Sequence, residues 1–437
     1  MRLLRLSLPI THGVLADPKE LTRKLIMHFR RICFWFSAWV GVTMSLAVSH
    51  ARGDEAALTR GRVAALVQAA PAARVAQSEA AVFEAAVTAA GVWSLDNPVV
   101  SGLAGVRFNP DGSRPLGAQA TLSWPVDLGG QRGARLDGAK AQHRAALASS
   151  DTTMRQVLLK ALLQHQLVLR DEREVALFTD RHALSQRFYA AAQRRQAAGG
   201  VPELDVALAA MQEKQDASSK ASAEGAREAD KLALLTLLGL SASPVVVGAL
   251  VPEGDPPPLA ALLQSIDQRV EVRAALATLD AAQAQAVRAR SARWPTISLQ
   301  AQYERDDGAD IGLLGLAIPI PVLNANRPEV VTSAAEVDAA GTRVAQSRVV
   351  AEGQLKELYT RYLATKDALD SLAPTEALAS RAVSLATRGY ELGENDLPSV
   401  LLVRREAIAV QAALLEVQHA HAAVKLELLV TAGRKPE

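Results

Sequence analysis

Few side chains in this 437-residue chain have the spacing that a catalytic or metal-binding site requires. His419 and His421 are the closest histidines beyond residue 51, and positions two apart do not share a helix face. Met154 and Met211 lie far apart, so no soft-metal site is predicted. Cys33 is the only cysteine, which excludes a disulfide within the chain. We therefore predict no catalytic residue, no metal site and no cofactor.

The glycine-rich stretch 129–133 (GGQRG) is the closest approach to a phosphate-binding loop. Its position after an alternating segment and before a long helical segment instead predicts a strand-to-helix turn. The sequence signatures of serine hydrolases, phosphate loops and zinc proteases are absent. For that reason an enzyme is not predicted. The net charge is +2 and no basic cluster is interleaved with aromatic residues, so a nucleic-acid-binding protein is not predicted either.

The N-terminus has the pattern of a secretory signal peptide. Two basic residues precede the apolar stretch 32–48, and Ser49-His50-Ala51 supplies small residues for cleavage. We expect the mature chain to begin near Arg52, although a transmembrane anchor is the alternative for a stretch of this length. Met1 and Met27 are both candidate start residues.

The rest of the chain repeats itself with a period of about 195 residues. Trp124 and Ile318 lie in similar proline-containing stretches, and Gly199 and Gly393 lie in similar glycine-containing turns. A Pro/Gly-rich stretch separates the copies. The predicted parts are an N-terminal extension with signal peptide (1–51), a first structural repeat (52–240), a linker (241–258) and a second structural repeat (259–437).

Each repeat contains two short segments in which apolar and polar residues alternate. Between 296 and 304, for example, Leu299 and Tyr303 alternate with Gln300 and Gln302. A period of two indicates strands. The predicted strands cover about 98–108 and 118–126 in the first repeat, and about 296–304 and 311–319 in the second.

The strands lie between helical segments. Alanine-rich stretches at 58–90 and 259–293 precede the strand pairs, and long stretches at 131–195 and 329–392 follow them. Pro374 should kink or break the second long helix, which Asn326 and Pro328 are placed to begin. Strands of this length suit a membrane barrel, but four strands cannot close one without other copies of the chain.

Several short stretches are similar in sequence to motifs of a known family, and they occur in the same order as in that family. They are 126–132 (VDLGGQR), 237–240 (LLGL), 269–275 (RVEVRAA), 292–299 (ARWPTISL) and 319–324 (PIPVLN). With the duplication and the signal peptide, they make the chain resemble the TolC-type outer-membrane efflux proteins over about residues 58–432. The two motifs that follow the strand pairs, 126–132 and 319–324, resemble those of the heavy-metal, CzcC-like subfamily.

The resemblance implies a mostly α fold with a small membrane β-barrel: long α-helical hairpins and four transmembrane strands per chain, duplicated, in a trimeric barrel and tunnel. It also implies a homotrimer in outer-membrane lipid, whose periplasmic end meets a periplasmic adaptor protein and, indirectly, an inner-membrane pump. The chain would then be a passive conduit for small substrates such as drugs or metal ions. Neither a nucleic acid nor a catalytic reaction is implied.

In that family the two glycine-containing turns lie at the periplasmic tip and meet the adaptor. Glycine permits the backbone angles of such a tight turn. The residues that the resemblance assigns to partner binding are Gly199, Val201, Leu204, Asp205 and Val206 in the first turn, and Tyr390, Gly393, Leu397, Ser399 and Val400 in the second.

The chain departs from the family at its acidic constriction. The usual carboxylate positions carry Ser399 and Leu402 in the second repeat, and Asp205 and Leu208 in the first. Asp205 and Asp396 are the candidate carboxylates for an acidic constriction in place of the usual ones. Alternatively, both are ordinary carboxylates that interact with a helix N-terminus.

Two other classes of protein fit part of the pattern. A periplasmic adaptor also has a long helical hairpin, but it needs a domain rich in short strands that is not seen here. A coiled-coil scaffold of an export complex has no use for strand pairs with one polar and one apolar face.

Overall fold

The computed structural model describes residues 57–94, 96–127, 129–242, 244–306, 309–321 and 324–433. The predicted signal peptide, its cleavage site after Ala51 and Cys33 lie outside the described residues. The described chain from residue 57 onward belongs to one compact unit, which is the subject of all that follows.

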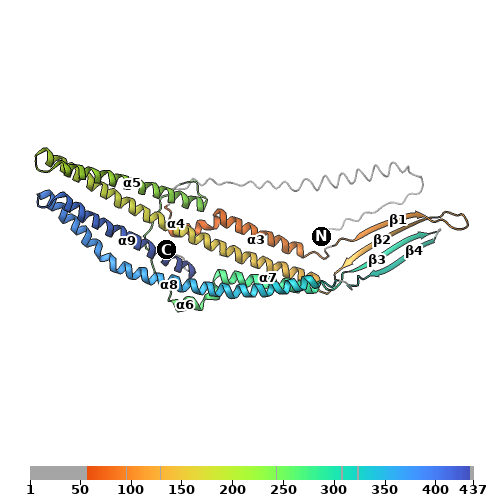
Figure 1. Ribbon diagram of the computed structural model, residues 1–437. Helices are drawn as coiled ribbons and strands as arrows, with labels where there is room; N and C mark the ends of the chain where they lie inside the picture. Colours follow the sequence, from red (N-terminus) through yellow and green to blue (C-terminus); the bar gives the residue numbers. More distant parts are fainter. Residues whose placement is uncertain are drawn as a thin grey trace, which may run out of the picture. The chain divides into compact units, whose positions relative to one another are not determined.

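The first repeat is built from helices on either side of a strand pair (Figure 1). Its long helix α4 has 67 residues, which corresponds to roughly 100 Å at 1.5 Å per residue. The elements are α2 (Arg60–Leu66), η1 (Val67–Ala69), α3 (Pro71–Ala90), β1 (Val99–Val106), β2 (Leu116–Val126), α4 (Gln131–Ala197) and α5 (Glu203–Leu238).

The second repeat has the same plan, with a 66-residue long helix α8. Its elements are α6 (Leu259–Gln264), η2 (Ile266–Gln268), α7 (Val270–Ser291), β3 (Ile297–Asp306), β4 (Ala309–Ala317), α8 (Arg327–Leu392) and α9 (Leu397–Thr431). The predicted fold class, mostly α with a small antiparallel sheet and an internal duplication, is confirmed.

The alanine-rich stretches at 58–90 and 259–293 are each interrupted rather than continuous. In the first repeat, Ala70 has an extended ψ of 146° and Pro71 begins a new helix. In the second repeat, Arg269 has a similar ψ of 141° before Val270 begins α7. Proline tolerates the first turn of a helix but not its interior, so Pro71 accounts for the first interruption.

The four strands form one antiparallel sheet in the order β1-β2-β3-β4. The central pair joins the two repeats, because β2 and β3 are in register from Ala118 opposite Arg305 to Val126 opposite Ile297. Within the repeats, β1 pairs with β2 and β3 pairs with β4. In the described chain, β1 and β4 are therefore edge strands with one unpaired side each.

The second long helix begins and continues differently from the prediction. Pro328 lies in its first turn, but Asn326 has a left-handed φ of 56° and its side chain donates to the carbonyl of Ala289 instead of capping α8. Of the two outcomes expected at Pro374, a kink or a break, the break is wrong, because α8 continues through this residue. Helix α9 packs along α8.

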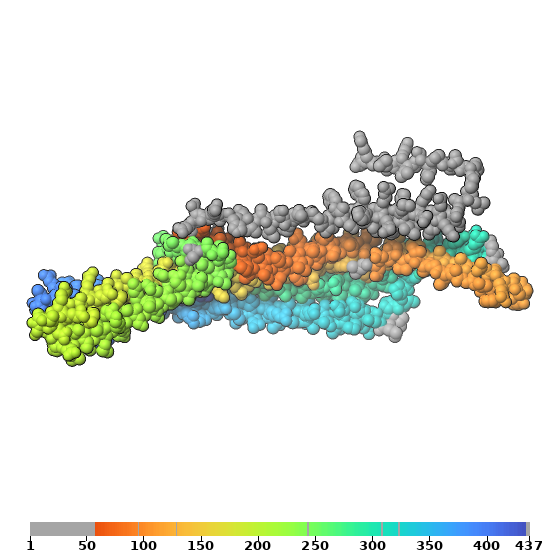
Figure 2. All heavy atoms as spheres, turned by 90° about the horizontal axis from the view of Figure 1, so that it is seen from above, coloured from red at the N-terminus to blue at the C-terminus, as the bar shows by residue number. Residues whose placement is uncertain are grey.

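Helix α4 is the central packing element, in contact with α3, α5, α7 and α9. Helix α8 packs against α7 and α9. In the space-filling view the turn between α4 and α5, in yellow-green, lies beside the blue turn of the second repeat (Figure 2). The largest buried apolar cluster joins α2, α3, α4, α5 and α9 to the linker, whose Val246 and Leu250 are buried.

The linker is anchored by a buried polar cluster. Arg60 donates to Gln166 Oε1 at 3.0 Å and to the carbonyl of Leu250 at 3.3 Å. His165 Nε2 lies 2.9 Å from the carbonyl oxygen of Leu58, and burial lowers the pKa of this imidazole. Since Leu58 also pairs with Val246, the start of the described chain and the linker are held on the same part of α4.

Candidate partner-binding tips and channel wall

Each long helix ends in a turn that glycine makes possible. Gly199 and Gly393 have φ values of 74° and 83°, which is the left-handed region that favours glycine. After α4, the amide of Gly200 donates to the carbonyl of Arg195 at 2.8 Å, which is the bond pattern of a Schellman motif. The two helices of each hairpin are therefore joined by short, well-satisfied turns.

The second turn has one further requirement. The amides of Glu394 and Asn395 both donate to the carbonyl of Gly389, at 2.8 and 3.2 Å. The Asn395 side chain folds back over Gly389, where a Cβ atom would collide with the amide group of Asn395. Glycine at 389 thus allows this turn to close tightly against the end of α8.

The interior of the tip is an apolar cluster that joins the two hairpins. Tyr390 and Phe188 pack edge to face with ring centroids 5.7 Å apart. Leu397 is 0 % exposed and Val400 is 2 % exposed within the same cluster. The expectation that Tyr390, Leu397 and Val400 offer their side chains to a partner is therefore corrected: they pack the two hairpins together.

The predicted tip residues that remain accessible come mainly from the first turn. Leu204 is 65 % exposed, Gly199 is exposed and Val201 is half-buried. Val206 is partly buried and packs against the tip cluster. In the second turn, the predicted tip residues that remain accessible are Gly393 and Ser399, and their neighbours Leu392 and Asp396 are exposed as well.

The two candidate constriction carboxylates occupy helix N-termini. Asp396 is the N-cap of α9, and its carboxylate accepts a hydrogen bond of 3.2 Å from the amide of Ser399. Hydrogen bonds from the side chain and from the amide of Ser399 lower the pKa of Asp396. Asp205 lies in the first turn of α5. These positions match the helix-terminus interpretation of both residues, since carboxylates stabilise the positive end of a helix.

Two charged links between the hairpins escaped the sequence analysis. Arg195 donates to the carbonyl of Tyr390 at 3.1 Å, and its guanidinium lies 4.9 Å from the centre of the Tyr390 ring. Deeper in the hairpins, Arg404 donates to Asp216 at 2.9 Å and to the carbonyl of Arg181 at 2.6 Å. Burial lowers the pKa of the Arg404 guanidinium.

Asp216 is the centre of the deeper link and is fully buried. Its carboxylate also accepts hydrogen bonds from Arg181 at 2.8 Å and Ser185 at 2.7 Å. The position of Arg404 within the apolar stretch 400–410 was the only sequence signal for this network, because an arginine there must be paired if it is buried.

The two central strands, β2 and β3, have one apolar and one polar face, whereas the edge strands carry apolar residues such as Leu103 and Leu313 on the polar side as well. Along β3, Leu299, Ala301 and Tyr303 are exposed and alternate with the less exposed Gln300 and Gln302. The register continues this pattern, because Trp124 lies opposite Leu299 on β2. The predicted alternation of side chains along β3 is confirmed.

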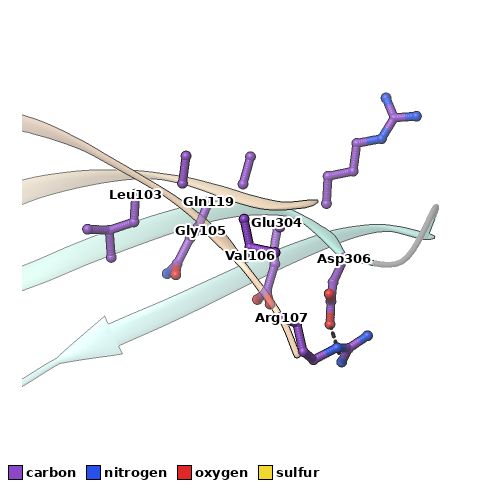
Figure 3. Close-up of a pocket in the computed structure, with 11 residues that line it drawn as sticks. Leu103, Gly105, Val106, Arg107, Gln119, Glu304 and Asp306 are labelled. Atoms are coloured by element: carbon purple, nitrogen blue, oxygen red, sulfur yellow. Dashed lines mark hydrogen bonds and ion pairs between the residues drawn. The ribbon is translucent and has the colours of Figure 1, made fainter. Parts of the chain in front are cut away.

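A cavity of about 330 Å³ lies on the sheet near its loop end (Figure 3). It is lined by residues of β1, β2 and β3, among them Leu103, Gln119 and Glu304. An ion pair of 2.9 Å between Arg107 and Asp306 lies beside it. The mixture of apolar, amide and carboxylate groups does not define a site for one ligand.

The candidate chemistry of the sequence does not converge in the fold. His421 stacks on Tyr362 at 5.3 Å and lies 3.2 Å from the Thr365 hydroxyl, so its ring has a packing role. Among the described residues, no three His, Cys, Asp or Glu side chains lie close enough to hold a metal ion. No helix in the same residues is long and apolar enough to cross a membrane.

The model of the outer membrane efflux protein family matches residues 62–240 and 261–434. The chain belongs to this family. It is an outer-membrane protein of the efflux type with long periplasmic helices, as the sequence resemblance implied. Its family and fold are those of channels and not of known enzymes.

The most similar relatives that we compared agree with this membership. The cobalt-zinc-cadmium resistance protein CzcC of Cupriavidus metallidurans is 27 % identical over 298 residues, which are 65 % of this chain and 70 % of CzcC. Among solved structures, the outer membrane protein VceC of Vibrio cholerae has a TM-score of 0.70 at 18 % identity, covering 86 % of this chain and 96 % of VceC. CusC has a TM-score of 0.67 at 18 % identity, covering 86 % and 92 %.

Proposed function

We propose that this efflux protein is the outer-membrane channel of a tripartite export system, and that it works as a homotrimer. Each chain contributes four strands to a closed barrel and two helical hairpins to a tunnel below it. The channel itself does no chemistry and spends no energy. It conducts substrates that an inner-membrane pump delivers through a periplasmic adaptor.

The open sheet carries this proposal. One side of β1 and one side of β4 lack partners within the described chain, and unpaired backbone groups in lipid cost several kcal/mol each. Other copies of the chain can satisfy both edges at once if β1 of one copy pairs with β4 of the next. Three copies would place twelve strands in the barrel.

The side chains at the edges fit this arrangement. Val100 on β1 is 76 % exposed and Leu314 on β4 is 91 % exposed. Both occupy the same face of the sheet as Leu122 and Ala301, with which they pair in register. A continuous barrel would thus have an apolar outer band. Its lumen would be lined by the amide side chains of the central strands and by Leu103, Ile311 and Leu313 of the edge strands.

The tips are the proposed adaptor-binding surface. They lie at the ends of α4 and α8 that are remote from the sheet, and they carry the accessible residues Gly199, Val201 and Leu204. The adaptor contact proposed for the second tip falls on Gly393 and Ser399, since the predicted apolar residues Tyr390, Leu397 and Val400 are buried. In the trimer, the three copies of Asp205 and the three copies of Asp396 would each form a ring of carboxylates at helix ends. We propose that these two rings narrow the tunnel.

Divalent metal cations are the cargo that we propose first. The support is the similarity to CzcC, whose name assigns it to cobalt, zinc and cadmium resistance. Drugs are the second candidate class, because the chain does not hold a metal cluster of its own in its described residues and any selection would fall to the pump. The alternative functions, a periplasmic adaptor or a coiled-coil scaffold, do not explain the two-faced sheet.

Disulfide cross-linking between the sheet edges tests the trimer. Because Cys33 is the only native cysteine, a Cys33→Ser chain can carry one new cysteine on each edge. Leu103→Cys would be combined in turn with cysteine at Ala309, Ile311, Leu313 and Gly315. We expect one or two of these pairs to link chains into dimers and covalent trimers, whereas each single cysteine does not.

The same preparations test conduction. Purified trimer placed in a planar bilayer should pass ions, and a strain that lacks the chain should lose tolerance to cobalt, zinc or cadmium. A protein that stays monomeric in native mass measurements, with no edge pair cross-linked, would remove the channel proposal. Loss of tolerance to drugs but not to metals would instead correct the cargo.

A further inference from the structure

The tryptophans of this chain are gathered at one level of the fold. Trp93 lies between α3 and β1, Trp294 lies between α7 and β3, and Trp124 is on β2 two register positions before its last residue. These are all the tryptophans beyond residue 51; the other two lie in the apolar stretch 32–48. Their side chains are 67 %, 62 % and 50 % exposed, respectively.

Two of these exposed rings are held firmly in place. A Cβ atom on Gly129 would approach the Trp294 ring to 2.6 Å, so the indole lies directly on the glycine backbone. Gln131 also donates a hydrogen bond to the carbonyl of Trp294. Arg132 has its guanidinium 5.7 Å from the centre of the Trp93 ring. An exposed indole that is positioned in this way is suited to contact something outside the chain.

Exposed arginines surround these tryptophans. Arg132 and Arg327 lie at the starts of the long helices α4 and α8, in equivalent places of the two repeats, and Arg293 precedes Trp294. Arg293 and Arg327 have no ion pair with any described residue. Other arginines at the two ends of the sheet pair with carboxylates: Arg135 with Asp127 at this end, and Arg107 with Asp306 at the other.

Figure 1 shows the region that carries these residues, where one end of each of α3, α4, α7 and α8 reaches the sheet. We call the six residues Trp93, Trp124, Trp294, Arg132, Arg293 and Arg327 the arginine–tryptophan collar. It occurs in both repeats, and Trp124 adjoins the apolar face of the sheet beside Leu299.

We propose that the arginine–tryptophan collar binds the headgroups of anionic phospholipids at the inner surface of the outer membrane. The proposal rests on the barrel proposed above. Tryptophan favours the membrane–water interface, because its ring is apolar and its N–H is polar. Guanidinium groups bind phosphate oxygens with two parallel hydrogen bonds, and each basic residue near an anionic surface strengthens the attraction.

The collar therefore sets the depth at which the chain sits in the membrane. The sheet above it lies in hydrocarbon and the long helices below it lie in the periplasm. Charge complementarity favours phospholipid over a second copy of the chain as the occupant, because the collar arginines are exposed and form no ion pair with another described residue. A phosphatidylglycerol headgroup supplies the negative charge that they need.

Fluorescence quenching tests the depth. The mature protein, with an N-terminus determined beyond residue 39, would be made with Trp294 alone (Trp93→Phe with Trp124→Phe) and with Trp124 alone (Trp93→Phe with Trp294→Phe). Each would be placed in vesicles of phosphatidylethanolamine and phosphatidylglycerol that contain lipids brominated at a shallow or a deep acyl position. We expect Trp294 to be quenched more by shallow bromine. Trp124 lies inside the sheet, roughly 7 Å beyond the sheet end that follows Trp294, and should be quenched more by deeper bromine.

Arginine substitution tests the headgroup. The double variant Arg293→Gln with Arg327→Gln would be compared with Arg343→Gln plus Arg388→Gln, two exposed arginines of α8 outside the collar. In a detergent titration with phosphatidylglycerol, we expect affinity to fall about five-fold for each collar arginine. The control pair should leave it unchanged, and phosphatidylcholine affinity should change in neither variant.

Failure of the collar is distinguishable from failure of the channel. If the trimer conducts ions but Trp294 is quenched by neither lipid, or if both arginine pairs have the same effect, the collar is overturned and the channel stands. If the protein inserts and is quenched as expected but neither forms trimers nor conducts, the channel is overturned and the collar stands. Burial of the collar between copies would appear as quenching that is absent in trimer and present in monomer.

Discussion

Arg404 on α9 and Asp216 on α5 form a buried ion pair of 2.9 Å across the two helical hairpins, although 188 residues separate them. Their side chains are 4 % and 0 % exposed. Arg181 and Ser185 of α4 bind the same carboxylate, so three helices meet at Asp216. The pair thus holds the hairpin of the first repeat to that of the second.

Removal of one partner should loosen this junction. In Asp216→Ala, the guanidinium of Arg404 stays buried without a counter-charge, which typically costs about 3–5 kcal/mol. We expect faster amide hydrogen exchange in 181–216 and 400–410, with the sheet unaffected. Arg405→Ala is the matched control, because Arg405 is exposed, pairs only with its neighbour Glu406, and should change protection little. Equal exchange in both variants would contradict a structural role for the pair.

Two charge substitutions at the tip should separate packing from partner binding. Leu204→Asp places a charge on an exposed side chain, so trimer yield should stay normal while affinity for the adaptor falls roughly tenfold or more. Val400→Asp buries the charge inside the tip cluster and should disrupt the tip itself. Trimer yield, protease resistance of the tip and adaptor cross-linking would be measured together. Normal cross-linking by Leu204→Asp would exclude the first tip as the adaptor surface.

The two faces of β3 should respond differently to a positive charge. Leu299→Arg would put the guanidinium on the apolar face and should cost about 2–4 kcal/mol if this position lies near the bilayer midplane. Gln300→Arg would put it on the polar face at much smaller cost. Refolding into lipid vesicles against a urea gradient compares the two directly. The assignment of faces would be wrong if both substitutions were equally damaging.

Stability should also depend on Asp171 of α4. Burial, together with a hydrogen bond to Asp230, raises the pKa of the Asp171 carboxyl to about 6, against the neighbouring charge of Arg170. The folded protein then binds the extra proton between about pH 4 and pH 6, so this group's contribution to stability falls as pH rises through about 6. Asp171→Asn should remove that fall.

The measurement is the thermal unfolding midpoint of wild type and Asp171→Asn at pH 5 and pH 8. The substitution also removes the interaction of Asp171 with the Asp230 carboxyl, so the comparison reports on this pair of carboxyl groups, while His419 of α9 is present in both proteins. We expect the variant to gain stability relative to wild type at pH 8. An unchanged difference between the two pH values would show that Asp171 is ionised throughout.

Local patterns were enough to predict the elements of this fold. The alternation around Leu299 identified a strand, and the glycines at 199 and 393 identified two helix ends, because both features depend on backbone conformation and on neighbours a few residues away. The duplication then ordered these elements into two equivalent repeats. At Pro374 a local rule offered a kink or a break, and the structure, in which α9 packs along α8, keeps the helix continuous.

Only the tertiary structure decided which way the tip residues point. Tyr390 and Val400 have the apolar character of partner contacts, but the opposing hairpin buries them. Asp216 and Arg404 find each other across a sequence distance that no local pattern records. The helix period in the sequence shows which residues share a helix face. Which other helix packs against that face depends on the tertiary fold. For this reason the burial and the pairing of residues at the tip could not be predicted from the sequence alone.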